Sequence, residues 1–148
     1  MGKATAQVTI ERPTDVVWSV VEDFGDLDWY GNVESCEVDG DIRHVRMQGS
    51  GLEADEVLFH RDEDARSFSY GVLAFRGDTK VPQGDGTWVD VDAMVGKHRA
   101  TITVTPADDS SCTVTYDLEL DDSADELLSM TSLNYQAKLD RLKRYCEA

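Results

Sequence analysis

The strongest constraint on the fold is an amphipathic helical pattern at the end of the chain, in residues 121–148. Apolar or small residues recur there three and four positions apart, which places them on one side of a helix. These residues are Ala124, Leu128, Thr131, Tyr135, Leu139, Leu142 and Cys146. A second stripe beside them consists of Leu127, Met130, Asn134 and Ala137. Ser123 and Glu126 have the spacing of a capping box at the start of the helix. So wide an apolar face must be covered, and we expect the rest of the chain to form a sheet that holds this helix.

The residues before the helix have the pattern of an antiparallel sheet. Apolar and polar residues alternate in residues 4–11, as in a half-buried strand. Asp39 and Gly40 suit a tight hairpin turn between two further strands. The last strand alternates too, and its apolar side consists of Val114, Tyr116, Leu118 and Leu120. We expect about seven strands, at 4–11, 33–38, 42–48, 52–61, 67–75, 94–105 and 112–120. Two short helices are expected after the first strand, at 13–23 and 25–30, the second of them a single turn.

This order of strands and segregated helices defines an α+β domain. A chain of 148 residues has the length of one domain, so we expect residues 1–148 to form a single unit with a substantial core. Residues 76–93 are rich in turn-forming residues and alternate little. We interpret this segment as an insertion or an entrance segment, in which Trp88, Val89 and Val91 could form a short extra strand.

The charge of the chain narrows its possible partners. Thirty acidic residues against 14 basic ones give a formal charge of -16. This charge repels phosphate backbones and anionic lipid head groups, so we expect neither nucleic acid nor a membrane surface as partner. The sequence has no apolar run long enough to span a bilayer and no signal-peptide core, which predicts a cytoplasmic protein without a membrane anchor. We expect a monomer or a weak homodimer.

Cysteine and histidine spacing gives no sign of a metal site. The three cysteines are far apart and form no CxxC pair, so we expect free thiols. The three histidines lack the HExxH spacing. No P-loop, GxGxxG motif or Ser-His-Asp order occurs either. We therefore predict no metal and no cofactor.

Several short motifs follow one another along nearly the whole chain. They are Val17-Trp18, residues 23–27 with Trp29, Val45-Arg46, Glu56-Val57-Leu58, Asp62 and Ser69-Tyr70. Their joint order resembles the polyketide cyclase/dehydrase branch of the START and Bet v 1-like superfamily. The resemblance implies a helix-grip fold, in which a curved antiparallel sheet wraps the terminal helix and leaves a cavity between them. Members hold lipids, sterols, plant hormones, flavonoids or polyketides there, and a minority catalyse reactions on them. The segment 76–93 departs from the compact form of the family.

Pockets of this kind are mostly apolar with a few polar groups, so inward-facing polar residues are the candidate site. If Leu58 faces the helix, Glu56 does so too. The opposite register would place Val57 and Phe59 inside, and hydrophobicity alone leaves both registers open. The resemblance places a pocket glutamate at Glu56, which favours the first. A buried carboxylate needs a partner, and we expect Arg46 on the preceding strand to supply it.

Further residues are expected to contact a ligand in this cavity. They are Trp29, His44, Leu58, Tyr70, His98, Tyr116, Met130 and Asn134. His98 is either a hydrogen-bonded core histidine or a catalytic base. The pair of Arg46 and Glu56 is either a structural ion pair or a pair that orients a ligand.

Two functions from different classes follow from the resemblance. The first is a carrier or sensor that binds a small hydrophobic molecule, such as a lipid, a polyketide or an isoprenoid-like compound. The alternative is a polyketide cyclase/dehydratase or lyase, in which Glu56 transfers a proton and Arg46 stabilises an oxyanion. The residues alone leave both functions open.

Overall fold

The structure is a computed structural model that describes residues 2–49, 51–82, 85–121 and 125–148. The expected capping box depends on Ser123, so it lies outside the described residues. The described helices are α1 (Thr14–Val21) and α2 (Asp125–Glu147), with a short 3-10 helix η1 (Val91–Met94). None of them is long and apolar enough to cross a membrane.

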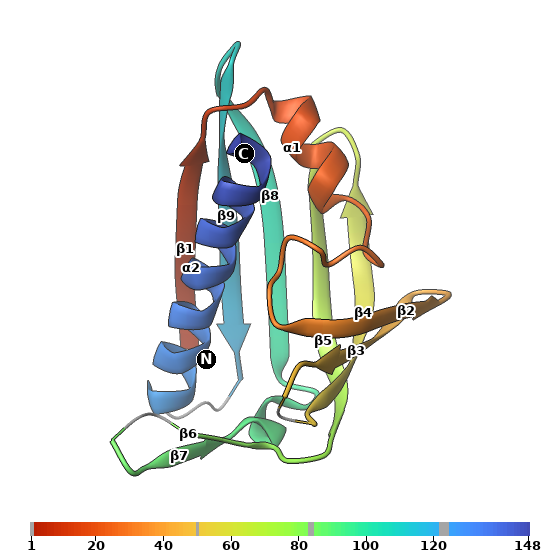
Figure 1. Cartoon of the computed structure of the whole chain (residues 1–148), viewed down its shortest axis with the longest axis vertical. Coiled ribbons are helices and arrows are strands. Elements are labelled where there is room, and N and C mark those ends of the chain that lie inside the picture. Colours follow the sequence, from red (N-terminus) through yellow and green to blue (C-terminus); the bar gives the residue numbers. More distant parts are fainter. Residues whose placement is uncertain (1, 50, 83–84, 122–124) are drawn as a thin grey trace.

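Seven strands form one antiparallel sheet in the order β1-β9-β8-β5-β4-β3-β2 (Figure 1). They are β1 (Gly2–Ile10), β2 (Val33–Asp39), β3 (Ile42–Met47), β4 (Glu53–Asp62), β5 (Ser67–Arg76), β8 (His98–Asp108) and β9 (Ser111–Leu120). The long helix α2 packs mainly along β1 and lies on one face of the sheet (Figure 1). This is the α+β helix-grip arrangement that the sequence predicts.

The core lies between α2 and the inner face of the sheet. The predicted apolar side of β9 is fully buried there, at Val114, Tyr116, Leu118 and Leu120. Tyr135, Leu139 and Leu142 of the predicted helical stripe face these residues from α2 and are also buried. Burial of each large aliphatic side chain contributes about 1.5 to 3 kcal/mol, so this layer supplies much of the folding energy.

Residues 25–30 form two turns, so the second short helix expected after β1 is wrong. Tyr30 N donates to Leu27 O at 2.9 Å, and Asp26 N donates to Asp23 O at 3.1 Å. The carboxylates of the two aspartates accept further hydrogen bonds from backbone amides two residues ahead. Aspartate side chains that bind their own backbone in this way favour turns over helix.

The strand β3 faces the core with the opposite parity to the one expected. Arg43 and Val45 are buried, whereas His44 and Arg46 point to the outer side. The hairpin pairing fixes this register, because Arg43 lies opposite Glu56 in β4. A shift of one residue exchanges the two faces of a strand. The sequence of β3 does not determine which face is buried, because one face carries the aliphatic Ile42 and the other carries Val45.

Two short strands within the segment 76–93 form a small arm beside the sheet. The strands β6 (Lys80–Pro82) and β7 (Trp88–Asp90) pair with each other and not with the main sheet. The extra strand is confirmed at Trp88 and Val89, whereas Val91 belongs to η1. The arm lies below the N-terminal end of α2 (Figure 1), and η1, which follows it, buries Val91 and Met94. The arm therefore adds apolar residues to the space between α2 and the sheet.

Phe59 covers the outer face of the sheet, which explains an apolar residue on that side. Its ring lies over Gly71, where an added Cβ would come within 2.6 Å of ring carbon Cζ. The guanidinium of Arg99 lies 5.5 Å from the ring centroid on the same face. Glycine at position 71 is needed for this contact, and the outward position of Phe59 is consistent with Glu56 facing inward.

Candidate functional site

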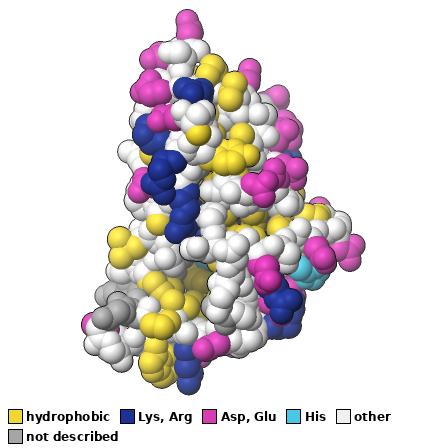
Figure 2. All heavy atoms as spheres, in the orientation of Figure 1, with side chains coloured by type: hydrophobic (Ala, Val, Ile, Leu, Met, Phe, Trp, Pro, Cys, Tyr) yellow, Lys and Arg dark blue, Asp and Glu magenta, His cyan; other side chains and the backbone are white. Residues whose placement is uncertain are grey.

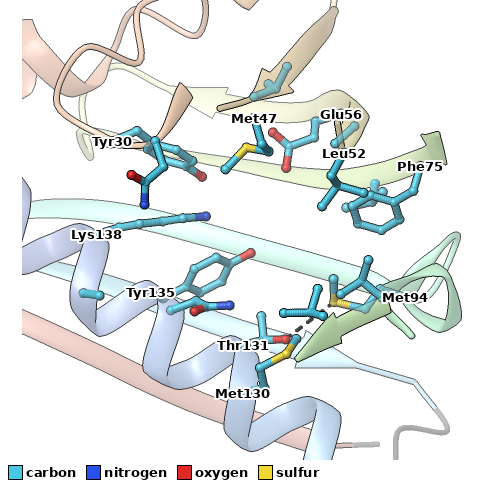
Figure 3. Close-up of a pocket in the computed structure, with 18 of the residues that line it drawn as sticks. Tyr30, Met47, Leu52, Glu56, Phe75, Met94, Met130, Thr131, Tyr135 and Lys138 are labelled. Atoms are coloured by element: carbon cyan, nitrogen blue, oxygen red, sulfur yellow. Dashed lines mark hydrogen bonds between the residues drawn. The ribbon is translucent and has the colours of Figure 1, made fainter. Parts of the chain in front are cut away.

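A cavity of about 260 Å³ lies between α2, the inner face of the sheet and the arm (Figure 3). Its wall has two chemically different ends. Leu52, Phe75, Met94 and Met130 form an apolar end next to the arm. Tyr30, Glu56, Tyr135 and Lys138 form a polar end, in which Lys138 lies further along α2 and Glu56 lies next to Leu52.

Glu56 is held at the polar end by a buried arginine. Arg43 Nε donates to Glu56 Oε1 at 2.8 Å, and Arg43 Nη1 donates to Phe24 O at 3.1 Å. The guanidinium also lies 4.1 Å from the ring centroid of Phe24 and 4.8 Å from that of Tyr70. Burial alone would lower the pKa of Arg43, but the Glu56 carboxylate outweighs this effect and raises it. The arginine therefore stays charged and fixes the carboxylate.

Tyrosine hydroxyls connect the polar end to the core. Tyr30 and Tyr70 share a hydrogen bond of 3.2 Å between their hydroxyls, and Tyr70 and Tyr116 share one of 3.3 Å. Burial raises the pKa of all three hydroxyls. They are therefore protonated at neutral pH and can donate hydrogen bonds as well as accept them.

His98 lines the cavity and pairs with Tyr135 of α2. Its Nε2 shares a short hydrogen bond of 2.5 Å with the Tyr135 hydroxyl. The Tyr135 ring in turn stacks on Tyr116, with 4.5 Å between the centroids. Burial lowers the pKa of His98 to about 4, so the ring is neutral at neutral pH. Its Nδ1 is buried without a hydrogen-bond partner in the described part of the chain.

Lys138 extends from α2 between two aromatic rings. Its ammonium lies 4.1 Å from the centroid of Tyr30 and 4.8 Å from that of Tyr135. Figure 3 shows the side chain reaching between these tyrosines, with its nitrogen toward the cavity. Desolvation lowers the pKa of this group. Arg141, one turn further along the helix, donates from Nη1 to Tyr30 O at 3.1 Å and so ties the loop to α2.

The structure brings four of the predicted site residues to the cavity wall. They are Glu56, His98, Met130 and Asn134. Tyr70 and Tyr116 lie one layer deeper, where they are fully buried and act through their hydroxyl contacts.

The remaining predicted residues do not line the cavity. The prediction that Arg46 pairs with Glu56 is wrong. The Arg46 side chain is 55% exposed, and its Nε lies 3.4 Å from Glu34 Oε2 on the surface. His44 shares the outer face of β3 and binds Asp55. Trp29 is buried beside Tyr30, and it is Tyr30 that reaches the cavity. Leu58 packs against the core behind the wall.

Sequence reasoning missed Arg43, Tyr30 and Lys138. The second helical stripe, which ends at Ala137, could have indicated Lys138. One further turn of that stripe passes through Lys138 and Arg141, and both line the cavity. Arg43 gave no such signal, since a charged residue beside a hairpin normally faces water.

A second hollow of about 420 Å³ is lined by the loop after α1 and by β2. Its wall is polar and includes Asp26, Asp28 and Glu34. Among the described residues, no three His, Cys, Asp or Glu side chains are placed to hold a metal ion. The first cavity is therefore the candidate site.

Comparison with known proteins places this architecture in the START-like class. The solved structures that share the fold include an uncharacterized protein from Bacillus thuringiensis, with a TM-score of 0.79, 18% identity and coverage of 99% of this chain and 100% of that one. A START superfamily protein from Mycobacterium smegmatis matches with a TM-score of 0.65, 13% identity and coverage of 96% and 92%. A protein from Thermobifida fusca has a TM-score of 0.70, 24% identity and coverage of 99% and 93%.

The family itself is identified from the sequence. Residues 1–147 match the family described as polyketide cyclase / dehydrase and lipid transport, and the chain belongs to that family. No curated protein matches the sequence significantly. The family suggests binding of a hydrophobic ligand or a cyclase activity, and the resemblance drawn from the sequence motifs is confirmed.

Proposed function

We propose that the chain binds one small, mainly apolar molecule in its internal cavity and acts as a carrier or sensor of that molecule. The observation that carries this proposal is the division of the cavity into two ends. Leu52, Phe75 and Met94 offer only apolar surface to a ligand, whereas Lys138 lies at the far end of the cavity and Glu56 borders the apolar end. Binding sites of this type combine an apolar wall with a few polar groups that fix orientation. The ligand therefore binds with its polar group toward Lys138.

The size of the cavity restricts the ligand. Its volume of about 260 Å³ lies just below the range of roughly 300 to 1,000 Å³ for drug-sized ligand sites. A molecule of two or three rings fits such a space, and a long-chain lipid does not. This size favours a small polyketide or isoprenoid-like compound over a membrane lipid.

The alternative, a cyclase/dehydratase or lyase, has weaker support. It requires a proton-transfer group together with a group that stabilises an oxyanion. Glu56 reaches the cavity, but Arg46 lies on the surface, and Arg43 lies behind Glu56 and not in the wall. A catalytic role would therefore require Glu56 to transfer the proton and Lys138 to stabilise the oxyanion. Binding of a ligand requires no chemical step from either residue.

Binding of the neutral fluorescent probe N-phenyl-1-naphthylamine tests the proposal. The probe should bind the wild-type protein saturably with one site. Ala54 lines the cavity from β4, and Ala54→Phe should fill the apolar end and weaken binding at least about tenfold. Ala74→Phe is the matched control, because Ala74 lies on the neighbouring strand outside the cavity wall. Equal probe affinity of a folded Ala54→Phe variant and the wild type would reject the cavity as the binding site.

A further inference from the structure

The charge of the cavity wall is opposite in sign to the charge of the chain. The whole chain has a formal charge of -16. Two cations, Lys138 and Arg141, line the cavity against one anion, Glu56. Arg43 neutralises that anion from behind, at 2.8 Å, and His98 is uncharged at neutral pH. The wall therefore presents a net positive charge to a ligand.

The surface next to the cavity has the same sign. Four of the chain's 14 basic residues lie in the last part of α2, at Lys138, Arg141, Lys143 and Arg144. Figure 2 shows Lys and Arg side chains in a column over this half of the helix, while acidic side chains lie mainly at the top and along the right edge of the view. A local basic surface on an acidic protein attracts anions and raises their concentration near the cavity.

Lys138 has no anionic partner of its own. Within the described part of the chain, no carboxylate lies within ion-pair distance of Lys138 or Arg141. The nearest groups to the Lys138 ammonium are the ring faces of Tyr30 and Tyr135. Ring faces attract a cation but leave its three N–H donors without strong acceptors. An ammonium that is half-buried and open to the cavity can therefore bind an acceptor from a ligand.

We propose that Lys138 binds a carboxylate of the ligand, so the cavity takes a small hydrophobic acid. This inference rests on the proposed function and adds the chemical class of the ligand and the residue that selects it. Glu56 repels a carboxylate placed against it, which leaves the Lys138 side of the polar end for the acid group. Arg141 already donates to Tyr30 O, so Lys138 is the cation left for the ligand. One ammonium matches one negative charge, whereas a phosphate carries more charge and needs more donors.

Two ligands of equal shape and different charge test this inference. 2-Naphthoate is ionised at neutral pH, and 2-acetonaphthone replaces its carboxylate by a neutral methyl ketone. Each is titrated against protein that contains bound N-phenyl-1-naphthylamine, and its affinity is obtained from probe displacement. The variants are Lys138→Met, which removes the charge and keeps the aliphatic stem, and Lys138→Arg, which keeps the charge. Lys143→Met is the control, because Lys143 on the same helix binds Thr9 O and Glu147 and not the cavity.

The wild type and Lys143→Met should bind naphthoate at least about tenfold more tightly than the ketone, as expected for a charge-assisted hydrogen bond. This preference should disappear in Lys138→Met and persist in Lys138→Arg. A wild type that binds both compounds equally would overturn the inference without any variant, and so would a preference that survives in Lys138→Met. In both cases the probe itself still binds, which keeps the proposed function. Failure of the probe to bind wild-type protein would instead reject the proposed function and the inference with it.

Discussion

Arg43 Nε lies 2.8 Å from Glu56 Oε1, and this ion pair joins neighbouring strands inside the protein. The side chains are only 2% and 12% exposed, respectively. The Arg43 Nη2 atom is buried without a hydrogen-bond partner among the described residues. The guanidinium thus depends on Glu56, Phe24 O and aromatic faces for the interactions that replace water. The arginine positions a cavity carboxylate, and the carboxylate keeps the arginine buried.

Removing one member of this pair should destabilise the fold strongly. Arg43→Met leaves the Glu56 carboxylate without its cation, and Glu56→Gln leaves the buried guanidinium without its anion. Each change should lower the free energy of unfolding by about 3 to 5 kcal/mol, and the double variant Arg43→Met/Glu56→Leu should recover much of the loss. Urea denaturation of the four proteins measures these values.

Arg46→Met is the control for this series. Its partner Glu34 is exposed, and both side chains are more than half accessible to water. The change should alter the free energy of unfolding by no more than about 1 kcal/mol. A loss at position 46 as large as that at position 43 would contradict the assignment of the buried pair.

The stability of the protein should fall in mild acid because of His98. Its pKa in the folded state is about 4, below the ordinary value of 6.5, since burial disfavours the charged ring. The unfolded chain therefore binds a proton between these two pH values while the folded protein does not. The contribution of the neutral ring to the free energy of unfolding is fully present above pH 6.5. Roughly 3 kcal/mol of this free energy should be lost as the pH falls to about 4.

The difference in unfolding free energy between wild type and His98→Gln isolates this effect. That difference should shrink as the pH falls from 7 to 4. His60→Gln is the control, because His60 is exposed on β4. The change in this difference between pH 7 and pH 4 should be larger for His98→Gln than for His60→Gln. A His98 resonance that titrates near its ordinary pKa by NMR would show the prediction to be wrong.

Gly31 should be required for the contact between the loop and α2. Its φ is +78°, and an added Cβ would lie 2.7 Å from Arg141 Cδ. Gly31→Ala should therefore displace Arg141 and weaken its hydrogen bond to Tyr30 O. Gly49 has almost the same φ, +77°, with open space around it. Thermal melts should show Gly31→Ala to be less stable than Gly49→Ala, and equal melting temperatures would mean that Arg141 does not hold the loop.

The arm formed by β6 and β7 should exchange its backbone amides faster than the main sheet. The two strands pair only with each other, and such a short isolated pair opens easily. Hydrogen exchange should therefore be faster for Val81 and Val89 than for Val114 and Tyr116. Equal protection would mean that the arm opens only with the whole domain and is not an entrance segment.

Most strands and the long helix were predictable because local patterns agree with the tertiary structure. The Asp39-Gly40 hairpin and the alternation of β9 each specify one face and one turn without help from distant residues. The turns after α1 were harder to predict. Their aspartate side chains oppose helix formation only when they accept hydrogen bonds from the backbone amides two residues ahead, and the sequence alone does not show this. The inward face of β3 carries Arg43, and this arginine can be buried only because Glu56 and aromatic side chains from other elements surround it.

The sequence predicted a cavity residue correctly only where the pattern of a single helix or strand determines its position. The helical stripe of α2 correctly placed Met130 and Asn134 at the cavity. The polar end combines Tyr30 from a loop, Glu56 from β4 and Lys138 from α2, and no spacing in the sequence connects these three. Their association arises from the way the sheet curves around the helix, which is a property of the assembled fold.

NMR of the methionine methyl groups tests the central claim most directly. Three of the four methionines line the cavity, at Met47, Met94 and Met130, and the fourth is Met1. In protein with labelled methionine methyls, 2-naphthoate should shift all three cavity signals saturably, with one dissociation constant. Its ring protons should give nuclear Overhauser contacts to Met94 and Met130 at the apolar end. Binding that leaves these three signals unchanged, or ring contacts that are absent from the apolar end, would contradict a ligand held in this cavity with its polar group toward Lys138.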